Sequence, residues 1–458
     1  MTQRSERTKK EARILAAART AHRPKQPFAR LKTIVKRAAA AVLPLVLWAR
    51  LARADAGTSG FAAVGAQARG GDAAPPARAG ATDLGNGYRV SVLTMGPGDA
   101  FVTLFGHDAL LVERAGLPPL VYNFGMYTEA AIAPHHVLGG TLRYYLEAAT
   151  LPATLAVYRA ENREVVRQTL DLEPARAERL ARALSLNTLP ENANYPYDFA
   201  RDNCTTRVRD ALDRALDGAL RRALSGPAKL TYREHALRFT ARDLPLYFLF
   251  DLGLGRPADR PLTAWDDAYL PDRLKSALRT VHLDGPSGSR PLVSSESVLE
   301  PARRAEVLSV PKVRAPWHAF VGLALGGALL ALGAGARRAA RIAFGVLGAL
   351  LGLFVGLLGV CVLLLLGTHV HPATHQNYNA LICPALALWL TVPASKVALG
   401  RAGAGAQLAR ASAVVAAVSV LGVVAAALAG QDSLRVALLL TPPLTALSIA
   451  SRRALRTP

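Results

Sequence analysis

The hydrophobic residues divide the chain into two unlike parts. From residue 316 onward the sequence is dominated by Ala, Leu, Val and Gly and has a single acidic residue, Asp432. This composition is typical of a membrane domain, here residues 316–458. The third of about five expected spanning helices is short and contains Pro384, which predicts a tilted or partly re-entrant segment. The five segments are Trp317–Ala336, Ile342–Gly367, Ala380–Ala394, Ala413–Ala429 and Val436–Ala450.

Residues 87–315 have the pattern of a folded domain with strands and helices. Pro174–Leu186 has helical periodicity, and an amphipathic helix follows Asn203 and is closed by Gly218. Short strands packed against helices indicate the α+β class. The expected strands are Tyr88–Met95, Asp108–Glu113, Leu120–Phe124, Leu142–Ala148 and, as a hairpin around Glu161 and Asn162, Leu155–Leu170.

Charge follows the same division. The formal net charge is +22, of which residues 1–53 carry +12 and residues 316–458 carry +9, which leaves +1 for residues 54–315. A nearly neutral soluble part lacks the basic face that phosphate binding needs, so no nucleic-acid partner is expected. Basic clusters beside apolar segments act instead as topology signals.

The topology signals at the two ends of the chain agree. The apolar run Ala38–Ala49 follows a basic stretch and precedes a small-x-small site at Ala52–Ala54, which predicts a signal peptide or anchor over residues 1–54. Residues 55–86 are rich in Ala, Gly, Asp and Pro and are expected to form a flexible linker. Loops after the first, third and fifth apolar segments are basic, which places residues 87–315 on the outer side of the membrane.

Cys204 is the only cysteine of the soluble domain, and it falls in the first turn of the helix after Asn203. Backbone N–H groups and the helix dipole favour a thiolate there, so the residue is a candidate nucleophile. The structural alternative is a buried thiol, although the polar setting of Asp202, Asn203 and two Thr residues argues against it. His107 opens an apolar strand and is the candidate base, with a plain surface histidine as the alternative.

Other histidines give weaker signals. His135 and His136 lie in a loop and are expected to be exposed, and His235 is a weaker base candidate within a helix. His369, His371 and His375 lie close together without a carboxylate or thiol nearby, so no metal site and no cofactor are expected. This loop is expected to face the active domain.

These residues belong to a set of motifs that together resemble the Lnb N-terminal periplasmic domain family. That family resembles circularly permuted NlpC/P60 papain-like thiol enzymes, in which the His precedes the Cys, as His107 precedes Cys204 here. The resemblance spans about residues 86–395. The motifs are Phe105–His107, Val121–Gly125, Tyr195–Phe199, Asp202–Arg207, Thr231–Arg233, Leu254–Gly255 with Asp259, Tyr269–Pro271 and the loop Thr368–Asn379.

The resemblance implies lipoprotein N-acyltransfer at the bacterial inner membrane, with a periplasmic catalytic domain. Cys204 would take an acyl chain from a membrane phospholipid as a thioester, and His107 would transfer the protons. The α-amine of a diacylglyceryl-cysteine lipoprotein would then accept the chain. Asn123 is the first choice for the group that orients His107, with Asp198 and Asp202 as alternatives. Candidate substrate contacts are Tyr122, Arg207, Arg233, His369, Asn377 and Asn379, with ion pairing as the simpler role for Arg207.

Two other functions remain open. A thiol hydrolase would use the same Cys204 and His107 but pass the acyl group to water, with a cell-wall amide or a lipid ester as its substrate. A non-catalytic envelope scaffold would keep the fold without the reaction. The expected partners under the first hypothesis are a phospholipid donor and lipoprotein substrates.

Overall fold

The computed structural model describes residues 87–128, 143–285, 288–367 and 372–453. Its soluble part is built on a seven-stranded sheet with the order β6-β4-β3-β2-β1-β5-β9, in which every neighbouring pair is antiparallel. The signal segment and linker expected over residues 1–86 lie outside the described residues. The strands are β1 (Tyr88–Met95), β2 (His107–Arg114), β3 (Leu120–Met126), β4 (Arg143–Thr150), β5 (Val165–Leu170), β6 (Asn194–Pro196) and β9 (Val293–Glu300).

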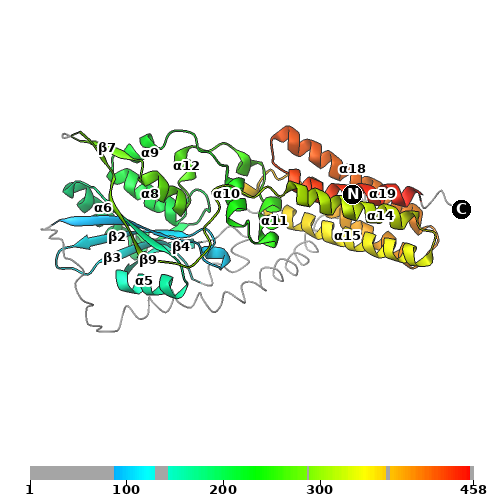
Figure 1. Ribbon diagram of the computed structural model, residues 1–458, viewed down its shortest axis with the longest axis horizontal. Helices are drawn as coiled ribbons and strands as arrows, with labels where there is room; N and C mark the ends of the chain where they lie inside the picture. The colour runs from blue at the N-terminus through cyan, green and yellow to red at the C-terminus, as the bar shows by residue number, and fades with distance from the viewer. Residues whose placement is uncertain (1–86, 129–142, 286–287, 368–371, 454–458) are drawn as a thin grey trace, which may run out of the picture. The chain divides into compact units, whose positions relative to one another are not determined.

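Helices cover both faces of this sheet (Figure 1). α6 (Pro174–Asn187), α8 (Cys204–Ala215) and α13 (Pro271–Leu278) pack on one face, where side chains such as Leu110 and Phe124 meet Leu212. α5 (Leu151–Ala160) covers the other face. The expected α+β class is therefore confirmed, and both predicted helices are present. Smaller elements are α7 (Pro190–Ala193), α9 (Ala219–Ala223), α10 (Tyr232–Phe239), α12 (Ala264–Asp267) and the hairpin of β7 (His282–Gly285) and β8 (Gly288–Pro291).

The predicted hairpin over Leu155–Leu170 is wrong in its first half, where α5 replaces a strand. Thr150 caps this helix by accepting a hydrogen bond from the backbone N–H of Ala153 at 3.4 Å, and a proline lies in the first turn. The buried residues are Thr154, Val157 and Tyr158, which have helical spacing. The short apolar pattern is compatible with a strand and with a helix. The cap at Thr150 and the burial of one side of α5 stabilise the helix.

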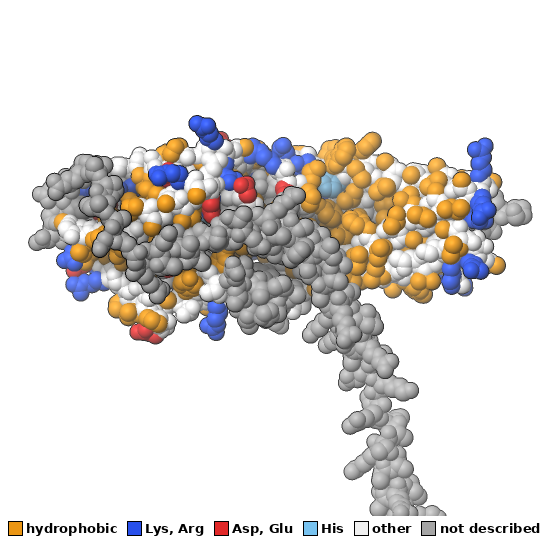
Figure 2. All heavy atoms as spheres, turned by 90° about the horizontal axis from the view of Figure 1, so that it is seen from below, with side chains coloured by type: hydrophobic (Ala, Val, Ile, Leu, Met, Phe, Trp, Pro, Cys, Tyr) orange, Lys and Arg blue, Asp and Glu red, His pale blue; other side chains and the backbone are white. Residues whose placement is uncertain are grey.

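The C-terminal part contains five helical segments that are long and apolar enough to cross a membrane. The third is interrupted at Cys383 and Pro384. Its tilt or partial re-entry stays a prediction. Figure 2 shows hydrophobic side chains over the bundle, with Lys and Arg at the end that carries the C-terminus. The helices are α14 (Ala315–Ala334), α15 (Arg338–Leu366), the broken segment of α16 (Asn379–Ile382), η5 (Ala385–Leu390) and α17 (Thr391–Ala398), then α18 (Ala404–Ala429) and α19 (Leu434–Arg453).

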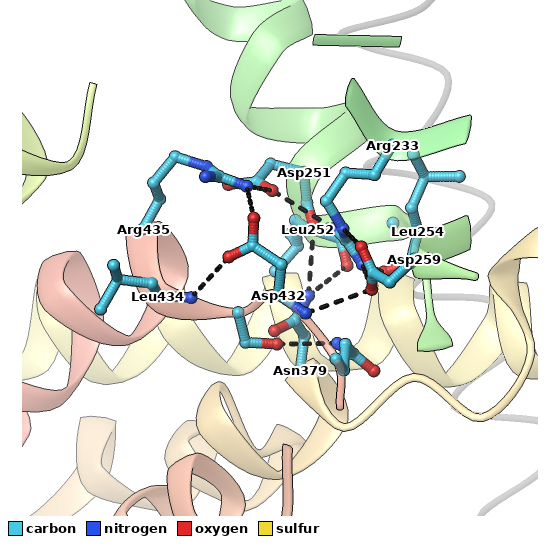
Figure 3. A network of polar contacts seen from close by, with 12 residues as sticks. Arg233, Asp251, Leu252, Leu254, Asp259, Asn379, Asp432, Leu434 and Arg435 are labelled. Carbon is cyan, nitrogen blue, oxygen red and sulfur yellow. Dashed lines mark hydrogen bonds and ion pairs between the residues drawn. The ribbon is translucent and has the colours of Figure 1, made fainter. Parts of the chain in front are cut away.

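The short apolar helix α11 (Leu244–Gly253) connects the sheet domain to this bundle. Its carboxyl-terminal end packs closely against α15. A Cβ atom added at Gly253 would lie only 3.3 Å from Cδ1 of Leu365. Asp251 of the same helix forms an ion pair with Arg435 of α19 at 2.8 Å (Figure 3). The sheet domain is thus attached to the bundle by both apolar and charged contacts.

Candidate active site

Cys204 is the first residue of α8, and local hydrogen bonds determine its position. The Asn203 side chain accepts from the backbone N–H of Thr206 at 2.8 Å, and the Thr206 hydroxyl accepts from the backbone N–H of Asn203 at 2.8 Å. These two bonds form a capping box, so that Asn203 and not Asp202 caps the helix. Asn203 also donates to the carbonyl of Tyr269 at 3.1 Å, so the cap is fixed to a distant segment.

The start of α8 lies where β2 and β3 stop pairing. The ladder between these strands ends at Ala109 and Asn123, although both strands continue beyond it. β3 has an irregular register here, and Gly125 takes a φ of +87°. A Cβ at Gly125 would lie 3.2 Å from Cβ of Cys204, so the absent side chain makes room for the helix start. The thiol therefore reaches the open end of the ladder.

Burial controls the ionisation of the thiol. It raises the pKa of Cys204 to about 11, against hydrogen bonding from the backbone of Asp108 and the side chain of Thr205, which lowers it. The thiolate expected from the helix start is therefore wrong for the resting site, because the loss of hydration outweighs the helix start. The thiol is neutral near pH 7.

His107 is the first residue of β2 and directly precedes Asp108, whose backbone hydrogen-bonds the Cys204 thiol. Burial and the charge of Arg163 lower the pKa of His107 to about 4, while a side-chain hydrogen bond with Asn123 raises it. Asn123 lies on the neighbouring strand, as expected for the group that orients the imidazole. Its Oδ1 and the Nε2 of His107 are both buried without a partner of ordinary hydrogen-bond geometry. The imidazole is therefore neutral and able to accept a proton.

No hydrogen bond joins Cys204 to His107 within the part of the chain that the structure describes. The thiol interacts instead with the hydroxyl of Thr205 at 3.9 Å and with the backbone of Asp108. Side chains alternate along a strand, so those of His107 and Asp108 leave β2 on opposite faces. The structure brings Cys204, His107 and Asn123 to the same end of the sheet and leaves the proton-transfer contact unformed.

Asp108 is a site residue that the sequence did not single out. Its carboxyl group is fully buried, and neither oxygen has a partner of ordinary hydrogen-bond geometry. Burial raises its pKa to about 7, and hydrogen bonding with Thr94 and Thr205 lowers it. The available signal was an acidic residue at the start of an apolar strand that contributes to the core.

The other candidates near α8 have partners within the protein. Arg207 forms an ion pair with Asp202 and lies over the Tyr195 ring, 4.0 Å from its centroid, which matches the simpler role expected for it. Asp198 accepts from the backbone N–H groups of Ala200 and Arg201, both at 2.9 Å, and therefore holds a turn. The remaining candidate on this face, the hydroxyl group of Tyr122, forms a 3.1 Å hydrogen bond with that of Ser185 on α6.

Arg233 and Asn379 lie at the carboxyl-terminal end of α11 (Figure 3), and Asn377 bonds to the same helix end. Arg233 is completely buried and donates to Asp251, Leu254, Gly255 and Asp259. The amide of Asn377 donates to the carbonyl groups of Leu252 and Gly253 at 2.8 and 3.0 Å, and that of Asn379 donates to Leu252 at 2.9 Å. These bonds satisfy the free carbonyls of a helix end, so the three side chains connect the domains.

Among the described residues, His235 is the other histidine that the sequence offered as a base. His235 is fully buried and hydrogen-bonded to Asp267 and Arg238, which indicates a structural role. His135, His136, His369 and His371 lie outside the described residues. Among the residues that the structure describes, no cluster of three His, Cys, Asp or Glu side chains is arranged to hold a metal ion.

The fold and the site define a membrane-associated protein that carries an α+β domain with a helix-start cysteine. Residues 81–237 match the family model described as the Lnb N-terminal periplasmic domain. The region that holds His107 and Cys204 therefore belongs to this family, as the sequence motifs indicated, and the protein combines a periplasmic domain with membrane-spanning helices. Comparisons with curated proteins and with solved structures give no match.

Proposed function

We propose that this protein is a lipoprotein N-acyltransferase of the bacterial inner membrane, with Cys204 as its nucleophile. The observation that carries the proposal is the position of Cys204. It lies at a capped helix start, at the open end of the β2–β3 ladder, in a Lnb periplasmic domain fixed to membrane helices. The permuted papain-like relationship of this domain remains part of the proposal.

In the first half-reaction, Sγ of Cys204 attacks the ester carbonyl carbon of a phospholipid. His107 accepts the thiol proton as the S–C bond forms, because the neutral thiol is a poor nucleophile. The ester C–O bond breaks, and the protonated imidazole gives its proton to the oxygen of the departing lysophospholipid. Asn123 stabilises the imidazolium by accepting a hydrogen bond from it. This step requires the His107 ring to turn toward the thiol.

In the second half-reaction, the α-amine of a diacylglyceryl-cysteine lipoprotein attacks the thioester carbonyl. An N–C bond forms, the C–S bond breaks, and the proton lost by the amine returns the sulfur to the thiol through His107. Donor and acceptor are both lipid-anchored, so a catalytic domain held at the membrane meets each at a high effective concentration. The membrane attachment thus favours acyl transfer between lipids over cleavage of soluble substrates.

The test uses the full-length protein in phospholipid nanodiscs, with an apolipoprotein added as acceptor. Wild type is expected to form an acyl-thioester and an N-acylated lipoprotein, both read by mass spectrometry. Cys204→Ala should abolish both products, and His107→Ala should slow the first by about 10²–10⁴-fold. Cys361→Ala is the matched control, since this cysteine lies in α15 and should leave both products unchanged.

Other outcomes separate the alternatives. Phospholipid consumption without an acceptor, equal to that with one, would identify a hydrolase. N-acylation that persists in Cys204→Ala would refute the proposed nucleophile. Because burial raises the pKa of the Cys204 thiol, slow alkylation near neutral pH is expected even for an active enzyme. Product formation therefore decides between enzyme and scaffold.

A further inference from the structure

The two ends of α11 are both fixed to the outer ends of membrane helices. At its beginning, Tyr247 donates to the carbonyl of Lys312 at 3.2 Å, just before α14 starts. At its end, Asn377 holds the last carbonyls from the segment between α15 and α16. Asp251 pairs with Arg435 at the start of α19. α11 therefore lies at the level where the chain enters the membrane.

A short 3-10 helix, η1 (Phe101–Thr103), packs on α11 and leads into the active site. The rings of Phe101 and Phe250 stack with centroids 5.9 Å apart and an interplanar angle of 16°. Phe105 meets the same Phe250 ring edge-on at 5.8 Å. Because Phe105 lies two residues before His107, this aromatic contact connects the membrane level directly to the catalytic end of β2.

Large apolar side chains on η1 and α11 are nevertheless exposed. Phe101 is 50 % exposed, Val102 38 % and Leu244 49 %. The loop that carries η1 is well fixed, since the N–H of Gly98 donates to the carbonyl of Thr103 at 2.9 Å and Asp99 is held by Arg304. A fixed loop that presents a phenylalanine and a valine to water marks an interaction surface.

We propose that Phe101, Val102 and Leu244 form a lipid-contacting surface that enters the outer leaflet and receives the acyl chains of the donor phospholipid beside His107. The proposal rests on the proposed acyl transfer for the role of the lipid, but the contact with the leaflet stands independently. The surface is at membrane level. The membrane-facing side chains of Trp317 and Phe320 in the first turns of α14 are also exposed, at 56 % and 63 %.

This surface shortens the distance between the ester group of a membrane phospholipid and the thiol of Cys204. A phospholipid ester lies at the boundary between headgroups and acyl chains, which is the depth that interfacial apolar side chains occupy. An acyl chain that packs against Phe101 places its ester group at the level of η1. The polypeptide continues from η1 through Phe105 to His107. The aromatic contacts thus give the thiol access to an ester without removing the whole lipid from the bilayer.

The experiment places tryptophan at position 101 of the full-length protein in nanodiscs. The discs contain phosphatidylcholine brominated on the acyl chains near the headgroup, because bromine quenches tryptophan fluorescence on contact. Each tryptophan is introduced into a parent protein whose four native tryptophans are replaced by phenylalanine. Phe101→Trp is expected to be quenched in these discs. Leu186→Trp is the matched control, since Leu186 is 61 % exposed on α6 and is expected to be unquenched. Equal quenching of the two variants, or none in either, would overturn the proposal.

A second measurement connects the surface to the reaction. The double variant Phe101→Ser, Val102→Ser is expected to raise the apparent KM for long-chain phospholipid about tenfold or more while thermal stability is retained. The loss in kcat/KM should be larger for long-chain phospholipid than for a short-chain, water-soluble ester, because the short ester does not need the leaflet. An unchanged KM would contradict the role in donor capture. A wild type with no acyl transfer at all would refute the proposed function but leave the quenching result standing.

Discussion

Asp108 combines complete burial with a position against Thr205 at the start of α8. An acid in this environment keeps its proton to higher pH, because burial disfavours the charged form. Asp108 follows His107 directly on β2, and its backbone hydrogen-bonds the thiol of Cys204. Its protonation therefore changes the charge near both Cys204 and His107. Asp108 is therefore the residue through which pH acts most directly on this region.

The pKa of Asp108 leads to a prediction about stability. Its folded value of about 7 exceeds its ordinary value of 3.8, so the folded state holds the proton more tightly. This contribution is fully present below the ordinary value and is lost as pH rises through about 7. We expect Asp108→Asn to remove the loss, which amounts to about 3 kcal/mol between about pH 5 and pH 8.

Thermal unfolding of both proteins in detergent at several pH values tests this. The difference in Tm between Asp108→Asn and wild type should become more positive as pH rises. Burial of the amide that Asp108→Asn introduces also changes the stability of the variant, but this change does not depend on pH. It shifts the Tm difference from wild type by the same amount at every pH. Parallel curves for the two proteins would show that Asp108 does not titrate in this range.

The break in the β2–β3 ladder is the element-scale feature that places the nucleophile. Its key position is Gly125, whose left-handed backbone and missing side chain admit Cys204. An irregularity of this kind beside a site redirects one side chain without changing the rest of the sheet. The helix start and the strand irregularity therefore act together.

Gly125→Ala tests this arrangement. The added methyl group meets Cβ of Cys204 at 3.2 Å, so the thiol should shift and thioester formation should fall about tenfold or more. Gly116→Ala is the matched control, because Gly116 has a similar φ of +78° but nothing within 4 Å of an added Cβ. Both variants should lose a comparable 1–3 kcal/mol or so of stability through backbone strain. Equal activity in the two variants would contradict the role of the break.

The charged network around α11 is the feature that joins the two parts of the molecule. Asp251 is 1 % exposed and contacts both Arg233 of the sheet domain and Arg435 of the bundle. Arg435 also pairs with Asp432 at 2.8 Å. Removal of one partner from such a buried group leaves an uncompensated charge, which costs more than the intact pair contributes.

Arg435→Ala is therefore expected to lower the free energy of unfolding by about 3 kcal/mol or more and to loosen the sheet domain from the bundle. Limited proteolysis should then cut the segment between Glu300 and Ala315 faster than in wild type. Arg182→Ala is the control, since the Arg182–Glu178 pair is exposed to solvent within one helix and contributes little to stability. Similar Tm values for both variants would show that the network does not hold the domains together.

Much of the fold follows from local patterns. The alternation in β1, the apolar strands β2 and β3, the cap at Asn203 and the five apolar segments each report on neighbouring residues, which sequence periodicity captures. The strand predicted in the region of α5 is wrong because the apolar positions there fit a strand and a helix equally well. The contacts of Asn377 and Asn379 with α11 could not be predicted from the sequence, because they join residues more than a hundred positions apart. The contact of Arg233 with α11 spans a shorter separation but also depends on tertiary packing.

The sequence by itself determined the nucleophile candidate, its capped helix and the outward placement of its domain, because these depend on local propensity and on charges beside apolar segments. Only the tertiary structure decided the environment of that nucleophile. Burial of the thiol, the acid at Asp108 and the space at Gly125 arise where separate strands and α8 meet. Hydration is lost through such long-range packing, and the ionisation of Cys204 follows the packing rather than the helix start.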